Sequence, residues 1–205
     1  MYQKNNSPRE NILRELRQNV TVAKKEGLPI RSVNKPEADL IDIFSVEFSL
    51  AAGQLYKVAN DKEASELVAQ LCEQNQWQSL FCPEVAIKNL IPASLFDSMV
   101  SSHQADKAAA AFTSCQALIA EFGAILVQSQ AQTRKATVLA PNHIVIAYPQ
   151  QVVYSIAEAL ANTPPASIQT SMQSIITGPS RTADIEKTLV MGAHGSKTLH
   201  LILII

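Results

Sequence analysis

Short runs of almost uninterrupted apolar residues constrain the fold of this chain more than any other feature. The clearest are residues 123–127, 143–147 and 199–205. Strands that are apolar on both faces must be covered on both faces, which is typical of a parallel sheet between layers of helices. The sequence therefore predicts an α/β fold in three layers with a mostly parallel central sheet. The closing run is too apolar for an exposed edge and is predicted to lie inside the sheet.

Helical patterns precede and separate these runs. Ser7 and Pro8 predict the start of a helix that ends near Gly27, and a polar stretch follows it. We therefore expect an N-terminal helical arm over residues 1–35 and an α/β domain over residues 36–205. A strand, a helix and a strand are then expected in the order from which parallel sheets are built.

The boundaries of the other elements follow from periodicity and from turn residues. Residues 101–116 are difficult to assign, and within them residues 108–112 fit either a helix or a buried segment. Three successive short strands without a helix between them predict a local antiparallel ribbon over residues 123–147. Val153, Ile156, Ala157 and Leu160 are expected on the inner face of a helix. The expected helices span 39–52, 60–72 and 150–161, and the expected strands span 54–59, 77–82, 123–127, 137–139, 143–147, 174–177 and 199–205.

Composition and motifs exclude several functional classes. The chain has 205 residues, with 17 lysines and arginines against 18 aspartates and glutamates, so its charge gives no long-range attraction to nucleic acid or to an anionic membrane. No P-loop, dinucleotide fingerprint, His-Glu-x-x-His or Gly-x-Ser-x-Gly motif is present. The N-terminus has no apolar core typical of a signal peptide, and the longest apolar run is far too short to cross a bilayer. We therefore expect a cytoplasmic protein.

The three cysteines are expected to be core residues. Cys72, Cys82 and Cys115 are odd in number and widely spaced, and no Cys-x-x-Cys pair is present. This spacing argues against a disulfide framework, a zinc site or an iron–sulfur cluster held by the chain itself. The sequence predicts no metal ligands and no cofactor of its own.

The segment most suited to ligand binding is the polar loop Thr177–Glu186, which follows a short apolar strand. Ligands bind at the carboxyl ends of strands in open α/β sheets. Glycine lets backbone N–H groups approach a ligand, and Arg181 offers a planar fork for a carboxylate or phosphate. The alternative is a capped turn in which Arg181 pairs with Asp184. The predicted ligand-binding residues are Gly178, Ser180, Arg181, Thr182, Asp184, Glu186 and, from the next segment, Gly195.

Two further residues are candidates for catalysis. His194 stands in Gly192-Ala193-His194-Gly195, where flanking glycines leave an imidazole approachable, although a histidine in a turn can be structural. Glu121 precedes an apolar strand and would there need a partner or a raised pKa. It can bind a ligand, act as a base or accept backbone hydrogen bonds.

Taken together, the residues Thr177–Glu186, Gly192–Gly195 and Leu199–Leu203 resemble the C-terminal signature of the LUD-domain family, of the lactate utilisation C type. The resemblance extends upstream through Ala120–Gly123 and Leu139–Ile144. It covers about the last hundred residues well and the N-terminal helices in outline.

This resemblance implies a fold similar to those of ribose-phosphate isomerase, CoA transferases and formyl-tetrahydrofolate cyclo-ligase. It implies a part in the oxidation of L-lactate to pyruvate beside two partner proteins. The iron–sulfur clusters are then expected in those partners, and a small anionic ligand near Arg181. The resemblance leaves open whether this chain is itself an enzyme.

The chain departs from the family pattern at two places. Phe122 and Ala124 stand where the family commonly has threonines in Glu-Thr-Gly-Thr, and Ser196 stands where it commonly has proline in His-Gly-Pro. Two alternatives to a subunit of a lactate oxidation system therefore stay open. One is a free-standing ligase or acyl-transfer enzyme in which Glu121 is the nucleophile. The other is a ligand-sensing module without catalysis.

Overall fold

The computed structural model describes residues 9–10, 15, 35–129, 131–163, 172–182, 190–191 and 195–205. The chain divides into two compact units, residues 1–34 and 35–205. The helix predicted from Ser7 lies almost entirely outside the described residues. The three residues described within it, Arg9, Glu10 and Glu15, are helical.

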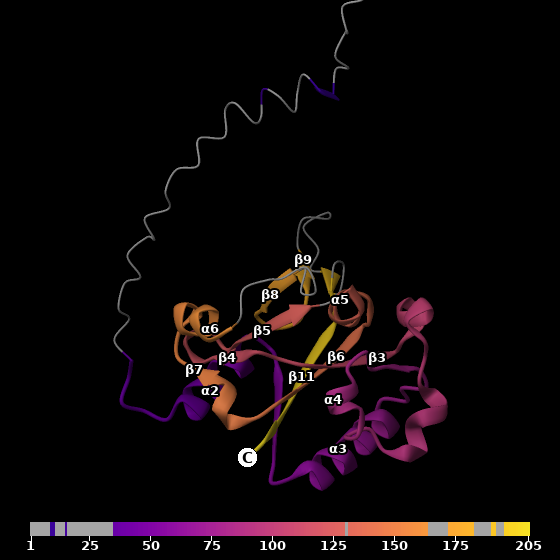
Figure 1. Ribbon diagram of the computed structural model, residues 1–205. Coiled ribbons are helices and arrows are strands. Elements are labelled where there is room, and N and C mark those ends of the chain that lie inside the picture. Colours follow the sequence, from indigo (N-terminus) through magenta and orange to yellow (C-terminus); the bar gives the residue numbers. More distant parts are fainter. Residues whose placement is uncertain are drawn as a thin grey trace, which may run out of the picture. The chain divides into compact units, whose positions relative to one another are not determined.

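A five-stranded sheet forms the centre of this unit, and all of its neighbouring strands are parallel. This confirms the predicted α/β class with a parallel central sheet. The closing strand lies between two neighbours, as predicted, and runs in yellow through the middle of Figure 1. Across the sheet the strands are β1 (Gln54–Val58), β11 (Thr198–Ile204), β6 (Asn142–Ala147), β3 (Ala110–Ser114) and β2 (Leu80–Phe81).

Both faces of the parallel sheet are buried. Ile144 and Ile202 pack with α3 (Asp61–Gln74) and α4 (Val85–Lys88) on one face. Val145 and Leu201 alternate with them and pack on the other face with α2 (Leu40–Leu50) and a second sheet. The alternation of these two sets along β6 and β11 explains why the apolar runs are uninterrupted.

The second sheet has four strands and is mainly antiparallel. Its strand β5 pairs antiparallel with β4 on one side and β8 on the other, whereas β4 and β7 are parallel. A two-stranded antiparallel ribbon joins β9 (Arg181–Thr182) to β10 (Val190–Met191). The order of the four strands is β7 (Val152–Val153), β4 (Ala117–Ile119), β5 (Ala124–Ser129) and β8 (Met172–Ile176).

The strand expected at residues 137–139 is wrong, because these residues end the helix α5 (Ala131–Leu139). Thr133, Ala136 and Thr137 are buried at helical spacing, while Val138 and Leu139 are exposed. The β-branched Thr137 and Val138 had suggested a strand, but the buried positions recur with the period of a helix. Since α5 separates β5 from β6, and these strands lie in different sheets, the predicted ribbon over residues 123–147 does not form.

The helix expected over residues 150–161 begins later, at Ile156, and extends to Asn162 as α6. Ser155 caps it by accepting a hydrogen bond from the backbone N–H of Glu158, and the Glu158 carboxylate accepts one from the N–H of Tyr154. This reciprocal cap fixes the start of α6. Val153 belongs to β7 instead, and Leu160, expected inside, is exposed.

The remaining helices are short and mostly of the 3-10 type. Two of them lie between α4 and β3, and the second of these falls in the stretch from residue 101 to 116 that was difficult to assign; β3 itself occupies residues 110–114 of that stretch. The strand β2 is shorter than predicted. None of the described helices is long and apolar enough to cross a membrane. The 3-10 helices are η1 (Ala93–Ser98), η2 (Ser102–Lys107), η3 (Ala120–Phe122) and η4 (Pro149–Gln151).

Candidate functional site

A cavity of about 360 Å³ lies beside the loop that follows β8. Gly178, Ser180 and Arg181 line it from this loop, and Gly195 lines it from the segment before β11. Four of the predicted ligand-binding residues therefore share one cavity, whose size suits a small molecule. The side chain of Thr182 is not described, and Asp184, Glu186 and His194 lie outside the described residues.

The loop is held against the end of α2 by close backbone contacts. Gly178 has a φ of 74°, and a Cβ added there would lie 2.0 Å from the carbonyl oxygen of Ala51. The Arg181 guanidinium donates a hydrogen bond of 3.0 Å from Nη2 to the same carbonyl oxygen. Glycine is required at this position because both its φ and the close approach exclude a side chain. Arg181 is thereby anchored by one nitrogen, and its other N–H groups make no hydrogen bond with the described residues.

The two signature segments meet directly. The backbone N–H of Ser180 donates to the carbonyl oxygen of Ser196 at 2.8 Å, and a Cβ on Gly195 would lie 3.2 Å from the Cβ of Ser180. Ser196, one of the departures from the family pattern, is buried and donates from its hydroxyl to the carbonyl oxygen of Ala140 at 2.8 Å. A proline cannot make this bond, so the serine adds a link between the segment before β11 and the end of α5.

The cavity opens at the amino ends of β6 and β11. His143 and Leu199, each the second residue of its strand, line it and are paired in the sheet register. The polar loop does follow the carboxyl end of a strand, β8, but β8 belongs to the antiparallel sheet. The expectation of a site at the carboxyl edge of the parallel sheet therefore does not hold for this cavity.

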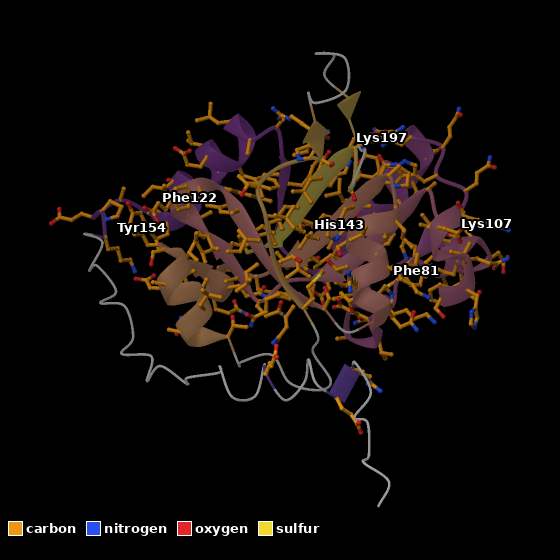
Figure 2. All side chains as sticks on the ribbon, turned by 90° about the horizontal axis from the view of Figure 1, so that it is seen from above. Phe81, Lys107, Phe122, His143, Tyr154 and Lys197 are labelled. Carbon is orange, nitrogen blue, oxygen red and sulfur yellow. The ribbon has the colours of Figure 1, made fainter. Side chains whose placement is uncertain are left out.

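His143 is a lining residue that the sequence analysis did not select. Its ring lies near the centre of the view in Figure 2 and is almost completely buried. Its Nε2 lies 2.8 Å from Oγ1 of Thr113, which is also fully buried. Within the described part of the chain that hydroxyl has no other acceptor, so we assign its proton to the bond with Nε2 and the ring proton to Nδ1. His143, which lines the cavity, then carries its N–H on Nδ1.

A polar residue at the start of an otherwise apolar strand was the signal available in the sequence. His143 follows Asn142 directly, and both residues lie within the stretch that carries the family resemblance. The apolar neighbours explain why its imidazole is neutral, since burial and, to a smaller extent, the nearby His200 together lower the pKa of His143 to about 4.

The two buried histidines predict an acid-sensitive fold. Burial also lowers the pKa of His200 to about 4. Unfolded histidine titrates near pH 6.5, so between about pH 6.5 and 4 the unfolded chain binds protons that the folded chain does not. Stability is therefore full above this window and is lost on acidification through it, by up to about 1.4 kcal/mol per pH unit for each histidine. Urea unfolding at about pH 7, 6 and 5 measures the loss.

Two variants test whether a buried histidine causes this dependence of the free energy of unfolding on pH. The slope should become smaller in His143→Asn and stay unchanged in His103→Asn, because His103 is exposed. A free energy of unfolding that does not vary with pH across the window in the unsubstituted protein would contradict the assignment.

Glu121 is not among the residues that line the cavity. It lies in η3, where its backbone N–H donates to the carbonyl oxygen of Tyr154 at 3.0 Å. Phe122 and Tyr154 lie together at one side of Figure 2, away from His143. Gly123, which follows Phe122 in the chain, packs against the backbone of α2. Glu121 therefore does not line the cavity, although β5, which begins three residues later, pairs with β8 directly before the loop that contains Arg181.

The cysteines are not activated thiols. Burial raises the pKa of Cys72 and of Cys82 to about 11, and it raises the pKa of the fully buried Cys115 further. All three are free. They therefore stay protonated at neutral pH. Within the ranges that the structure describes, no three histidines, cysteines, aspartates or glutamates gather as a metal site.

Known proteins resemble this chain in sequence and in fold. Lactate utilization protein C of Deinococcus radiodurans is 31% identical over 107 residues, which are 51% of this chain and 50% of that protein. The chain thus spans about half the length of this curated relative. A crystal structure of a DUF162 family protein from Deinococcus radiodurans has the same fold, with a TM-score of 0.62, 17% identity, and coverage of 83% of this chain and 99% of that one. The model of the LUD domain family matches residues 42–204, and the chain therefore belongs to the LUD domain family.

Proposed function

We propose that this chain is the component of a lactate utilisation system that holds no cluster and binds a small carboxylate of the lactate and pyruvate type. The similarity to lactate utilization protein C supports the pathway. The chemistry of the cavity beside Arg181 supports the ligand. In this proposal the redox centres belong to iron–sulfur partner proteins, which the family resemblance implies.

The observation that carries the proposal is a set of hydrogen-bond donors that, among the described lining residues, includes no carboxylate. Arg181 is the charged residue among the described lining residues. His143 offers its Nδ1–H, and the hydroxyl of Ser180 makes no hydrogen bond with the described residues. A carboxylate accepts hydrogen bonds and carries the charge opposite to that of a guanidinium, so it matches this set. Because the pKa of His143 is low, the ring donates as a neutral group at physiological pH.

The roles of these residues follow from their geometry. Arg181 binds the carboxylate through the N–H groups that Ala51 does not use. His143 donates to an oxygen of the ligand, either of the carboxylate or on the neighbouring carbon. The hydrogen bond from Thr113 holds the ring in one tautomer, so the pair orients the ligand and does not remove its proton.

Substitution of Arg181 tests this site. We expect Arg181→Ala to weaken the binding of L-lactate and pyruvate at least about tenfold, the effect of losing a charged hydrogen-bond partner. Arg181→Lys should bind with intermediate affinity, since an ammonium lacks the planar fork. Isothermal titration calorimetry measures both.

The matched control is Arg134→Ala, which removes an exposed arginine from α5. It should bind like the unsubstituted protein. Equal affinity of Arg181→Ala and the unsubstituted protein, with the fold intact by circular dichroism, would remove Arg181 from the site.

The pathway is tested separately in cells. The tagged chain should co-purify with proteins that carry iron–sulfur clusters, and its deletion should abolish growth on L-lactate while growth on pyruvate continues. Unimpaired growth of the deletion strain on L-lactate, in a host that needs this pathway, would contradict the role. No observation among the described residues favours the acyl-transfer alternative, because Glu121 does not line the cavity.

A further inference from the structure

A second cavity, of about 440 Å³, lies at the opposite edge of the parallel sheet. Its wall includes Glu84, just after β2, and Ser114, the last residue of β3. Because β2 and β3 are parallel to β6 and β11, this is the edge formed by the carboxyl ends of the strands. The first cavity lies at the edge formed by the amino ends. The two cavities therefore share no lining residue.

Glu84 is held across the end of the sheet in an unusual way for its position. It precedes α4 as the N-cap residue, but its side chain does not cap that helix. Instead, Oε2 accepts hydrogen bonds from the backbone N–H of Ser114 at 3.0 Å and from its hydroxyl at 2.5 Å. Oε1 makes no hydrogen bond with the described residues. The carboxylate is thereby fixed in place with one oxygen still able to accept.

Gln116 supplies the complementary donor. Its Oε1 accepts a hydrogen bond from the backbone N–H of Gln128, which orients the amide and leaves Nε2 without a partner among the described residues. Gln132 and Thr133 extend the polar wall from the first turn of α5. The wall thus offers both an acceptor, on Glu84, and a donor, on Gln116.

These groups define the chemistry of the occupant. No lysine or arginine is among the described lining residues, so an anion would face Glu84 uncompensated. An ammonium group pairs with Glu84 but leaves the Gln116 amide without an acceptor. A hydroxyl group both donates and accepts, and neighbouring hydroxyls satisfy both residues at once. We propose that this cavity binds a neutral polyhydroxylated molecule, with adjacent hydroxyls between Glu84 and Gln116.

Either a free sugar or the ribosyl group of a nucleoside supplies such hydroxyls, and titration separates the two. The full chain is titrated by isothermal titration calorimetry with D-ribose, D-glucose, adenosine and 2′-deoxyadenosine, with putrescine as the amine probe. We expect binding of at least one compound with adjacent hydroxyls and none of putrescine. Preference for adenosine over both sugars and over its deoxy form identifies a nucleoside site, and preference for a sugar identifies a free-sugar site.

Glu84→Gln should weaken this binding about tenfold. Gln132→Ala tests a second residue of the cavity wall, whose side chain is exposed. Glu37→Gln is the matched control, since Glu37 is exposed and outside the cavity. L-lactate binding should be unchanged in all three, which separates this site from that of Arg181. Absence of any polyol binding, binding of putrescine instead, or equal polyol affinity in Glu84→Gln and the unsubstituted protein would each overturn the proposal.

Discussion

Replacement of Gly123 by alanine is expected to lower the free energy of unfolding by at least about 3 kcal/mol. Gly123 has a φ of 55°, and a Cβ added there would lie 2.2 Å from the backbone nitrogen of Phe48 and 2.3 Å from the carbonyl carbon of Glu47. These atoms belong to the backbone of α2, so no side-chain rotation can relieve the contact. The helix has to move away from η3, and the strained backbone at Gly123 adds a further cost. Urea unfolding monitored by circular dichroism measures the change.

Gly195→Ala is the matched control for this effect. Its added Cβ would lie 3.2 Å from the Cβ of Ser180, and its φ does not lie in the left-handed region. We expect a loss of less than about 1 kcal/mol, in the range of an ordinary substitution. A Gly123→Ala protein as stable as Gly195→Ala would show that α2 and η3 do not pack as described.

The second large effect is expected from Phe48→Ala, at about 3–5 kcal/mol. Phe48 is fully buried and stacks on Phe44 with the ring centroids 5.2 Å apart. Its ring also fills the space next to Gly53, where an added Cβ would lie 2.4 Å from it. Removal of the ring thus leaves a cavity in the buried apolar cluster that joins α2 to the two sheets.

An exposed residue of the same helix provides the comparison. Val46→Ala should change the free energy of unfolding by less than about 0.5 kcal/mol, because the Val46 side chain is 59% exposed. The midpoint of urea unfolding, at constant denaturant dependence, measures both variants. A loss of similar size in the two variants would contradict the assigned burial of α2.

The α/β class and the interior position of β11 were predictable because they depend on burial alone. An uninterrupted apolar run indicates a strand that is covered on both faces, and β6 and β11 are such strands. The four-stranded antiparallel sheet was not predicted as a separate layer. Its strands pair with partners distant in sequence, such as β5 with β8, and no local pattern specifies such a pairing.

The candidate site was predictable in part. The chemistry of Gly178, Ser180 and Arg181 is local to one loop, so the sequence identified it. His143 was missed because its role depends on a fully buried threonine from another strand. Glu121 was a candidate because its segment resembles the family pattern, yet it does not line the cavity, since a shared pattern does not specify which side chains face a ligand. Glu84 carried no signal, since its contact with Ser114 joins residues that are 30 positions apart.

The position of β11 has a consequence for assembly of the sheet. It is inserted between β1 and β6, although β1 precedes it by more than a hundred residues along the chain. Until β11 takes its place, β1 and β6 each present an open row of backbone N–H and C=O groups, and the adjacent apolar faces are incomplete. Such edges are templates for strands of other molecules. Fragments that end before Thr198 should therefore associate with one another. In the intact chain β11 pairs with both of these edges, so they are closed to strands of other molecules.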